Sequence, residues 1–198
     1  FKGSWAKRLD NGESVIIDLI APHSVSYPEG TRAPRREAKL GHGHIIATHG
    51  TELSLIDRDE MYLRSFDSEP GTRAFVAGTS ALLCAKAWKI SDRMMSDQKL
   101  ANSGLKPRRL LPKDSADLYR LIRSISPEEA SAVFSEGESH IRAGASISQG
   151  RQRLISICSD PGFIANQVSI SWDASPDFEQ KVDDEVRSWI SRFGSVRG

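Results

Sequence analysis

The chain has 198 residues, with 27 Lys and Arg against 26 Asp and Glu, so its formal net charge is +1. This balance argues against a histone-like or polybasic nucleic-acid binder, although it permits a local basic patch. A chain of this length suits one domain, or one domain with a small helical annex. It can bury a core without disulfide bonds.

Two features of the composition bear on where the protein resides. Cys84 and Cys158 each lie in an apolar run with no Cys or His at metal-ligand spacing, which predicts two buried, reduced thiols. No stretch approaches the roughly 20 apolar residues of a membrane span. We therefore expect a cytoplasmic protein without a membrane partner. The sequence begins at Phe1 without an initiator methionine, so a leader, a tag or a longer N-terminal segment could have been removed.

The first part of the chain, residues 1–78, is predicted to be rich in strands. An Asn-Gly pair at residues 11–12 lies between two apolar runs and predicts a β-hairpin, because both residues tolerate a positive φ. The β-branched run 15–20 is nearly continuous, which predicts a central strand buried on both faces. Shorter strands are expected over residues 45–48, 52–57, 61–66 and 73–77.

A long connection is expected over residues 22–43, where three prolines and three glycines interrupt any regular pattern. Connections of this length in compact domains are usually functional or disordered. His42, His44 and His49 form a loose cluster, and the spacing of the first two places both rings on one face of a strand, but no acid or cysteine accompanies them, which argues against a metal site. The connection also carries a group of basic residues: Arg32, Arg35, Arg36 and Lys39.

The second part, residues 79–198, is predicted to be helical. Apolar residues recur at helical spacing over 80–95 and 114–125, with a basic linker at 99–113 between them. Ser126, followed by Pro127 and by Glu129, is typical of a helix N-terminus. Further helices are expected over residues 151–158 and 176–193. Strands first and helices after them predict an α+β fold, with one part at 1–78 and a helical part at 79–198.

Two single charges lie in apolar surroundings and are candidates for chemistry. Asp18 interrupts a buried strand, where an unpaired carboxylate would be costly. Its alternative role is that of a strand-end carboxylate bound to a backbone N–H or to an Arg. Lys86 interrupts an apolar helical stretch, where it either points into a cleft or snorkels at the edge of the core.

The start of the second predicted helix carries a pair of acids, Asp114 and Asp117. They are three residues apart and share one helix face, although helix capping would explain one of them. The linker before them has five basic residues, which suits contact with phosphate or nucleic acid, but also suits a solvated charged linker: Lys99, Lys106, Arg108, Arg109 and Lys113.

Taken together, these segments resemble nucleotidyltransferase-like proteins of the abortive-infection toxin type, which belong to the DNA polymerase β superfamily. Residues 82–93 fit an L-L-x-x-K-x-x-x-L-x-x-R pattern, with Ile90 at the third Leu position, and residues 113–122 fit K-D-x-x-D-L-Y-R-L-L, with Ile122 at its last position. The strand that contains Asp18 resembles the strand that supplies the third metal-binding carboxylate of that superfamily. The resemblance covers roughly residues 5–125.

The resemblance implies a partial nucleotidyltransferase-type mixed β-sheet followed by a C-terminal helical bundle. It implies transfer of a nucleoside monophosphate from an NTP to an RNA such as tRNA or to a protein, with Mg²⁺ ions held by carboxylates. Asp18 would bind metal, Lys86 would reach the triphosphate, Asp114 would orient Lys86 or the acceptor, and Asp117 would support that helix end. Arg93, Arg35 and Arg36 would add nucleotide contacts. An antitoxin protein is a further implied partner.

One part of the superfamily pattern is missing, namely Gly-Ser followed after about ten residues by an Asp-x-Asp pair. Gly3-Ser4 is followed by Asp10-Asn11-Gly12, which is too close and ends in Gly. We therefore expect the acid pair to lie upstream of Phe1 and this chain to be a fragment that is inactive by itself. The alternative is a degenerate, non-catalytic fold that binds a protein or RNA through its basic loops.

Overall fold

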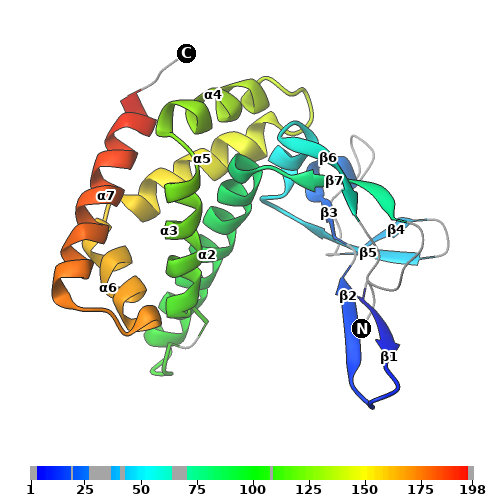
Figure 1. Cartoon of the computed structure of the whole chain (residues 1–198), viewed down its shortest axis with the longest axis horizontal. Coiled ribbons are helices and arrows are strands. Elements are labelled where there is room, and N and C mark those ends of the chain that lie inside the picture. The colour runs from blue at the N-terminus through cyan, green and yellow to red at the C-terminus, as the bar shows by residue number, and fades with distance from the viewer. Residues whose placement is uncertain are drawn as a thin grey trace.

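The computed structural model describes residues 4–18, 20–26, 37–40, 43–63, 71–107 and 109–195. They form an α+β fold in which small sheets lie at one end of a large helical region (Figure 1). Strands give way to helices at Gly78. Among the described residues, no helix combines the length and the apolar character needed to cross a membrane.

The first two strands confirm the predicted hairpin. β1 (Ser4–Arg8) and β2 (Ser14–Asp18) pair antiparallel, and the turn between them places Gly12 at a φ of 85°. The prediction that β2 is a central strand is wrong within the described part of the chain, where β2 pairs with β1 alone. Residues 15–18 of the β-branched run therefore form part of the two-stranded β1–β2 hairpin, which extends away from the helices in Figure 1.

A mixed three-stranded sheet follows. β3 (Ile20–Pro22) runs parallel to β5 (Gly43–Thr48), and β4 (Glu37–Leu40) pairs with β5 antiparallel. The predicted strand over 45–48 is confirmed as part of β5. The expected uninterrupted connection over 22–43 is wrong, because it contains the short helix α1 (His23–Ser26) and β4. Part of that connection, which includes Arg32, Arg35, Arg36 and His42, lies outside the described residues.

The strand predicted over 52–57 is replaced by a 3₁₀ helix, η1 (Glu52–Leu55). Gly50, at a φ of 94°, turns the chain, and the fully buried Glu52 carboxylate accepts the Gly50 N–H at 2.6 Å. This side chain-to-backbone bond competes with an extended conformation. An antiparallel hairpin follows, formed by β6 (Arg58–Leu63) and β7 (Thr72–Ala77). The strand predicted over 73–77 is confirmed, and the one predicted over 61–66 begins three residues earlier.

The helical region contains α2 (Thr79–Asn102), α3 (Pro112–Ser124), α4 (Pro127–Glu138), α5 (Gly144–Cys158), α6 (Pro161–Trp172) and α7 (Pro176–Ser195). The predictions for α3, α4 and α7 are confirmed, and the Ser126 hydroxyl accepts the Glu129 N–H at 3.2 Å as expected of an N-cap. α2 runs beyond its predicted end and shortens the basic linker to residues 103–111. α6 was not predicted; its N-terminus is capped by Asp160, which accepts the Phe163 N–H.

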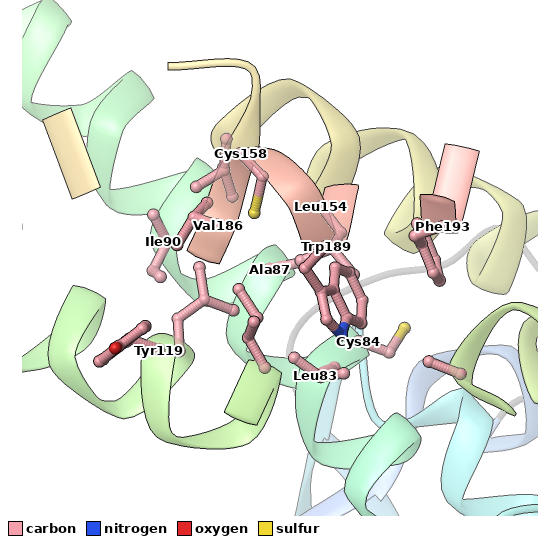
Figure 2. Packing of buried hydrophobic residues seen from close by; sticks show 14 of the residues in the cluster. Leu83, Cys84, Ala87, Ile90, Tyr119, Leu154, Cys158, Val186, Trp189 and Phe193 are labelled. Carbon is pink, nitrogen blue, oxygen red and sulfur yellow. The ribbon is translucent and has the colours of Figure 1, made fainter. Parts of the chain in front are cut away.

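One hydrophobic core holds the helices together. Figure 2 shows Leu83, Cys84 and Ile90 of α2 packed with Tyr119 of α3, residues of α5 and Trp189 of α7. Both cysteines are buried and free, which confirms the predicted thiols, and burial raises the pKa of each to about 12. Leu53 of η1 belongs to the same core, so the strand-rich part and the helices are joined through it.

Candidate functional site

A cavity of about 720 Å³ lies where the mixed sheet meets α2. One wall comes from the start of α1, the end of β5 and the turn that follows it. The other wall is one face of α2, because its residues recur at helical spacing. We call this cavity the α2 cleft. Its polar and aromatic lining residues are His23, Thr48, His49, Thr51, Trp88, Lys89, Asp92 and Arg93.

A stack of rings forms the aromatic side of the α2 cleft. The ring centroids of His23 and His49 are 4.1 Å apart, and those of His49 and Trp88 are 5.0 Å apart. Trp88 Nε1–H donates to the Ser146 carbonyl oxygen at 3.3 Å, and the Arg153 guanidinium lies 3.8 Å from the indole centroid. The stack is therefore held from both the sheet side and the helical side.

Burial lowers the pKa of His49, and the neighbouring His23 lowers it further. The imidazole is consequently neutral near pH 7. The buried Glu52 carboxylate has Oε1 3.8 Å from His49 Nδ1, and Oε1 also accepts the Ser24 N–H at 3.4 Å. Glu52 thus connects the turn after β5 to α1, which fixes the two segments that carry the histidines.

The cationic side of the α2 cleft depends on Asp114, whose side chain is fully buried. Lys89 Nζ lies 3.1 Å from its Oδ1, and Arg93 donates to its Oδ2. The Leu111 N–H also donates to Oδ2, at 3.2 Å. Burial raises the pKa of Asp114, but the hydrogen bonds from Lys89, Leu111 and Arg93 outweigh this and lower it. Asp114 is therefore an ionised anchor for two cations of the cleft. We call Asp114, Lys89 and Arg93 the Asp114 cluster.

A second carboxylate anchors two more cations on the neighbouring face of α2 and α3. Lys86 Nζ lies 3.0 Å from Asp117 Oδ2, and Arg120 donates to Oδ1 at 3.0 Å. The hydrogen bond from Lys86 is the main reason that the pKa of Asp117 is lowered, and burial opposes it. We call these three residues the Asp117 cluster. The two clusters together hold four cations and two carboxylates, so this junction of α2 and α3 has an excess of two positive charges.

The structure separates residues that the sequence placed together. The helix that carries Lys86 packs against the helix that Asp114 opens. Lys86, however, is paired with Asp117, and Asp114 holds Lys89 and Arg93 instead. Asp114 also accepts a backbone N–H of its own helix start. Its observed contacts are those of a salt-bridge anchor and a helix cap, and its expected role of orienting Lys86 or the acceptor stays a prediction.

The remaining predicted residues contribute no described side chain to the α2 cleft. Asp18 is the last residue of β2, and its side chain is not among those described. Arg35 and Arg36 lie outside the described residues altogether. Within the part of the chain that is described, His, Cys, Asp and Glu form no group of three that could hold a metal ion.

Sequence reasoning missed Lys89 and Trp88, and it considered His49 only as part of a histidine cluster that could hold a metal. Lys89 lies three residues after Lys86, so the same helical face already pointed to it. The contribution of Trp88 and His49 had no local signal, because it depends on how the turn after β5 packs on α2.

Comparisons with known proteins leave the family undefined. No protein-family model matches the chain, and searches of curated proteins and of solved structures found no match.

Proposed function

We propose that this protein is nucleotidyltransferase-like and binds a nucleoside triphosphate in the α2 cleft. The observation that carries the proposal is that the cleft places a stack of aromatic rings beside a cluster with excess positive charge. A nucleotide has two matching halves, an aromatic base and an anionic phosphate chain. Such a base suits contact with the exposed edge of the ring stack, where 45% of the His49 side chain is exposed although both ring faces are covered, and the phosphates suit Lys89 and Arg93.

The charge balance of the α2–α3 junction supports phosphate binding. Each carboxylate holds two cations, so each cation has only part of its charge compensated. Lys89 has 43% of its side chain exposed, so its ammonium group can turn toward a ligand while its backbone stays helical. Asp114 stays buried and keeps the cluster in place. The chain's own contribution would be to bind and orient the triphosphate rather than to move a proton.

The reaction proposed for the complete catalytic centre is transfer of a nucleoside monophosphate to an RNA or protein acceptor. Mg²⁺ would supply activation of the attacking hydroxyl and stabilisation of the α-phosphate. Two-metal transfer needs more carboxylates than Asp18, so we expect no labelled product when this chain is incubated with labelled NTPs, Mg²⁺ and total RNA or protein acceptors. Clear labelling would show that the required acids are within this sequence and were misidentified.

The second candidate is a degenerate nucleotidyltransferase-like fold that binds a protein or RNA without catalysis. The observation that favours it is the set of contacts of Asp114, which serves as a salt-bridge anchor and caps α3. The encoded sequence upstream of Phe1 distinguishes the two. A Gly-Ser and Asp-x-Asp pattern there would favour the enzyme, and its absence would favour the binding module.

Binding in the α2 cleft is tested by titrating the protein into a fluorescent ATP analogue and measuring its anisotropy. Lys89→Gln removes a charge that faces the cleft but keeps an amide that can donate to Asp114. Lys99→Gln removes the same charge from the exposed far end of the same helix and is the matched control. We expect Lys89→Gln to weaken binding about tenfold, as loss of one charge-assisted contact implies. We expect Lys99→Gln to change it little.

Two outcomes would count against the proposal. One is the absence of binding at low salt, and the other is an equal effect of Lys89→Gln and Lys99→Gln. Binding should also weaken as salt is raised, because the phosphate contacts are electrostatic.

A further inference from the structure

A second concave surface lies on the other side of Lys89 from the α2 cleft. It is a groove of about 430 Å³ between α2 and α3, which run side by side in Figure 1. Its apolar lining comes from Leu82, Ala85 and Leu121, and its cationic rim comes from Lys86, Lys89 and Arg120. All of these residues are described and lie on helices. We call this surface the α2–α3 groove.

The apolar lining of the groove consists of one exposed side chain, Leu82, and two half-buried ones, Ala85 and Leu121. Leu82 is 45% exposed, whereas the adjacent Leu83 is fully buried in the core. Leu82, Lys86 and Lys89 follow one another at spacings of four and three residues, so they form one line along α2. Seven residues of helix rise about 10 Å. The groove therefore has the length of about two turns of an α-helix.

The charge of the rim selects the kind of occupant. Three cations, Lys86, Lys89 and Arg120, border the groove against one lining carboxylate, Asp117. The rim thus carries an excess of two positive charges. Lys89 is also paired with Asp114, which compensates part of its charge. Arg120 is also held over the Trp172 ring, at 5.1 Å from its centroid, which keeps its guanidinium at the rim. A basic ligand would meet an unfavourable field here, and an acidic one a favourable field.

We propose that the α2–α3 groove is the docking site of a partner protein that presents an acidic amphipathic helix. Apolar residues of that helix cover Leu82, Ala85 and Leu121. Its Asp or Glu side chains compete with Asp117 for Lys86 and Arg120. The groove shares Ala85 and Lys89 with the α2 cleft, but Leu82, Arg120 and Leu121 line the groove and not the cleft, so variants at these positions test the docking site separately from nucleotide binding.

The experiment is a selection from a library of helical peptides of about 15 residues, the length at which isolated helices begin to persist in water. Enriched peptides are then titrated by anisotropy against the wild type and three variants. Leu82→Ser removes the exposed apolar contact, and Arg120→Glu reverses a rim charge. Met95→Ser is the control, because Met95 is 47% exposed on the same helix but does not line the groove. Circular dichroism checks that each variant is folded.

We expect the enriched peptides to carry an apolar stripe flanked by acidic residues. Their affinity should fall about tenfold with Leu82→Ser and by at least as much with Arg120→Glu, and should not change with Met95→Ser. Basic peptides, or equal affinity for the wild type and Leu82→Ser, would overturn the proposal. An empty selection combined with binding of a single-stranded oligouridylate that Arg120→Glu abolishes would assign the groove to nucleic acid instead.

Discussion

Replacing Asp114 with Asn tests whether this buried carboxylate organises the junction of α2 and α3. The substitution keeps the volume of the side chain but removes the charge that Lys89 and Arg93 share. It also replaces one of the two carboxylate oxygens by an amide nitrogen, which cannot accept the Leu111 N–H if it faces that group. The variant therefore weakens the contact between α2 and α3, and it also weakens the N-terminal cap of α3.

The size of the effect follows from the exposure of the partners. Lys89 and Arg93 are 43% and 30% exposed, so each can return to solvent when its anion is lost. Each pair is then worth about 1 kcal/mol, nearer to a surface pair than to a fully buried one. Loss of the capping bond adds about 1 kcal/mol. We expect Asp114→Asn to lower the free energy of unfolding by about 3 kcal/mol at pH 7.

The measurement is urea unfolding followed by circular dichroism, with Asp117→Asn as the matched control. Asp117 binds two cations as well, but its side chain is 40% exposed, so we expect a loss of at most about 1 kcal/mol. Equal losses for the two variants would refute the argument that burial makes Asp114 the stronger anchor.

The pH dependence gives a second check on Asp114. Its pKa is lowered in the folded protein, so its stabilising contribution is present above the unfolded pKa of about 3.9 and is lost as the pH falls through the folded pKa. The difference between wild type and Asp114→Asn should therefore be constant near neutral pH and shrink below about pH 4. A difference that persists unchanged into that acidic range would contradict the assigned charge.

Three further predictions concern the core and the cleft. Because burial raises the pKa of Cys84 and Cys158 to about 12, neither thiol should react with Ellman's reagent at pH 8 until the protein is unfolded. Gly150→Ala should lower the thermal midpoint by several degrees, because its new methyl would collide with Cys84 Sγ, whereas Gly194→Ala, with open space around it, should leave the midpoint unchanged or raise it. Because burial lowers the pKa of His49, its contribution to stability should be complete above about pH 6.5 and decline below it, and His49→Gln should make the fall of the unfolding free energy shallower between pH 6.5 and pH 5.

Local signals in the sequence were sufficient for some elements of the fold. The Asn-Gly turn and the capping residues of α4 predict their structures because the preference lies in the backbone of those residues. The strand prediction for residues 52–57 was wrong because Glu52 is buried and binds the backbone of its own turn. Strand propensity does not represent this interaction. The prediction of a central strand over residues 15–20 was wrong because an apolar β-branched sequence indicates a strand but not how many strands pair with it.

The candidate site depends on how two helices align, and the sequence does not specify this. Helical spacing placed Lys86 on one helix and both acids on one face of the other, and the two helices do meet. The alignment of α2 against α3 then decides the pairs, so that Lys86 meets Asp117 and Lys89 meets Asp114. A shift of one helical turn would have produced the pair that the sequence suggested.

Trp88 has a consequence that extends beyond the cleft it lines. A Cβ at Gly50 would lie 2.7 Å from the Trp88 Cβ, and a Cβ at Gly150 would collide with Cys84 Sγ and lie 3.1 Å from Trp88 Nε1. These three positions come from a turn, α2 and α5, and they form one steric unit. A smaller side chain at position 88 would release neither limit, because its Cβ would still crowd Gly50 and Cys84 Sγ would still crowd Gly150, and Gly50 also needs its positive φ. Related sequences should therefore keep glycine at both positions even where the residue at position 88 changes.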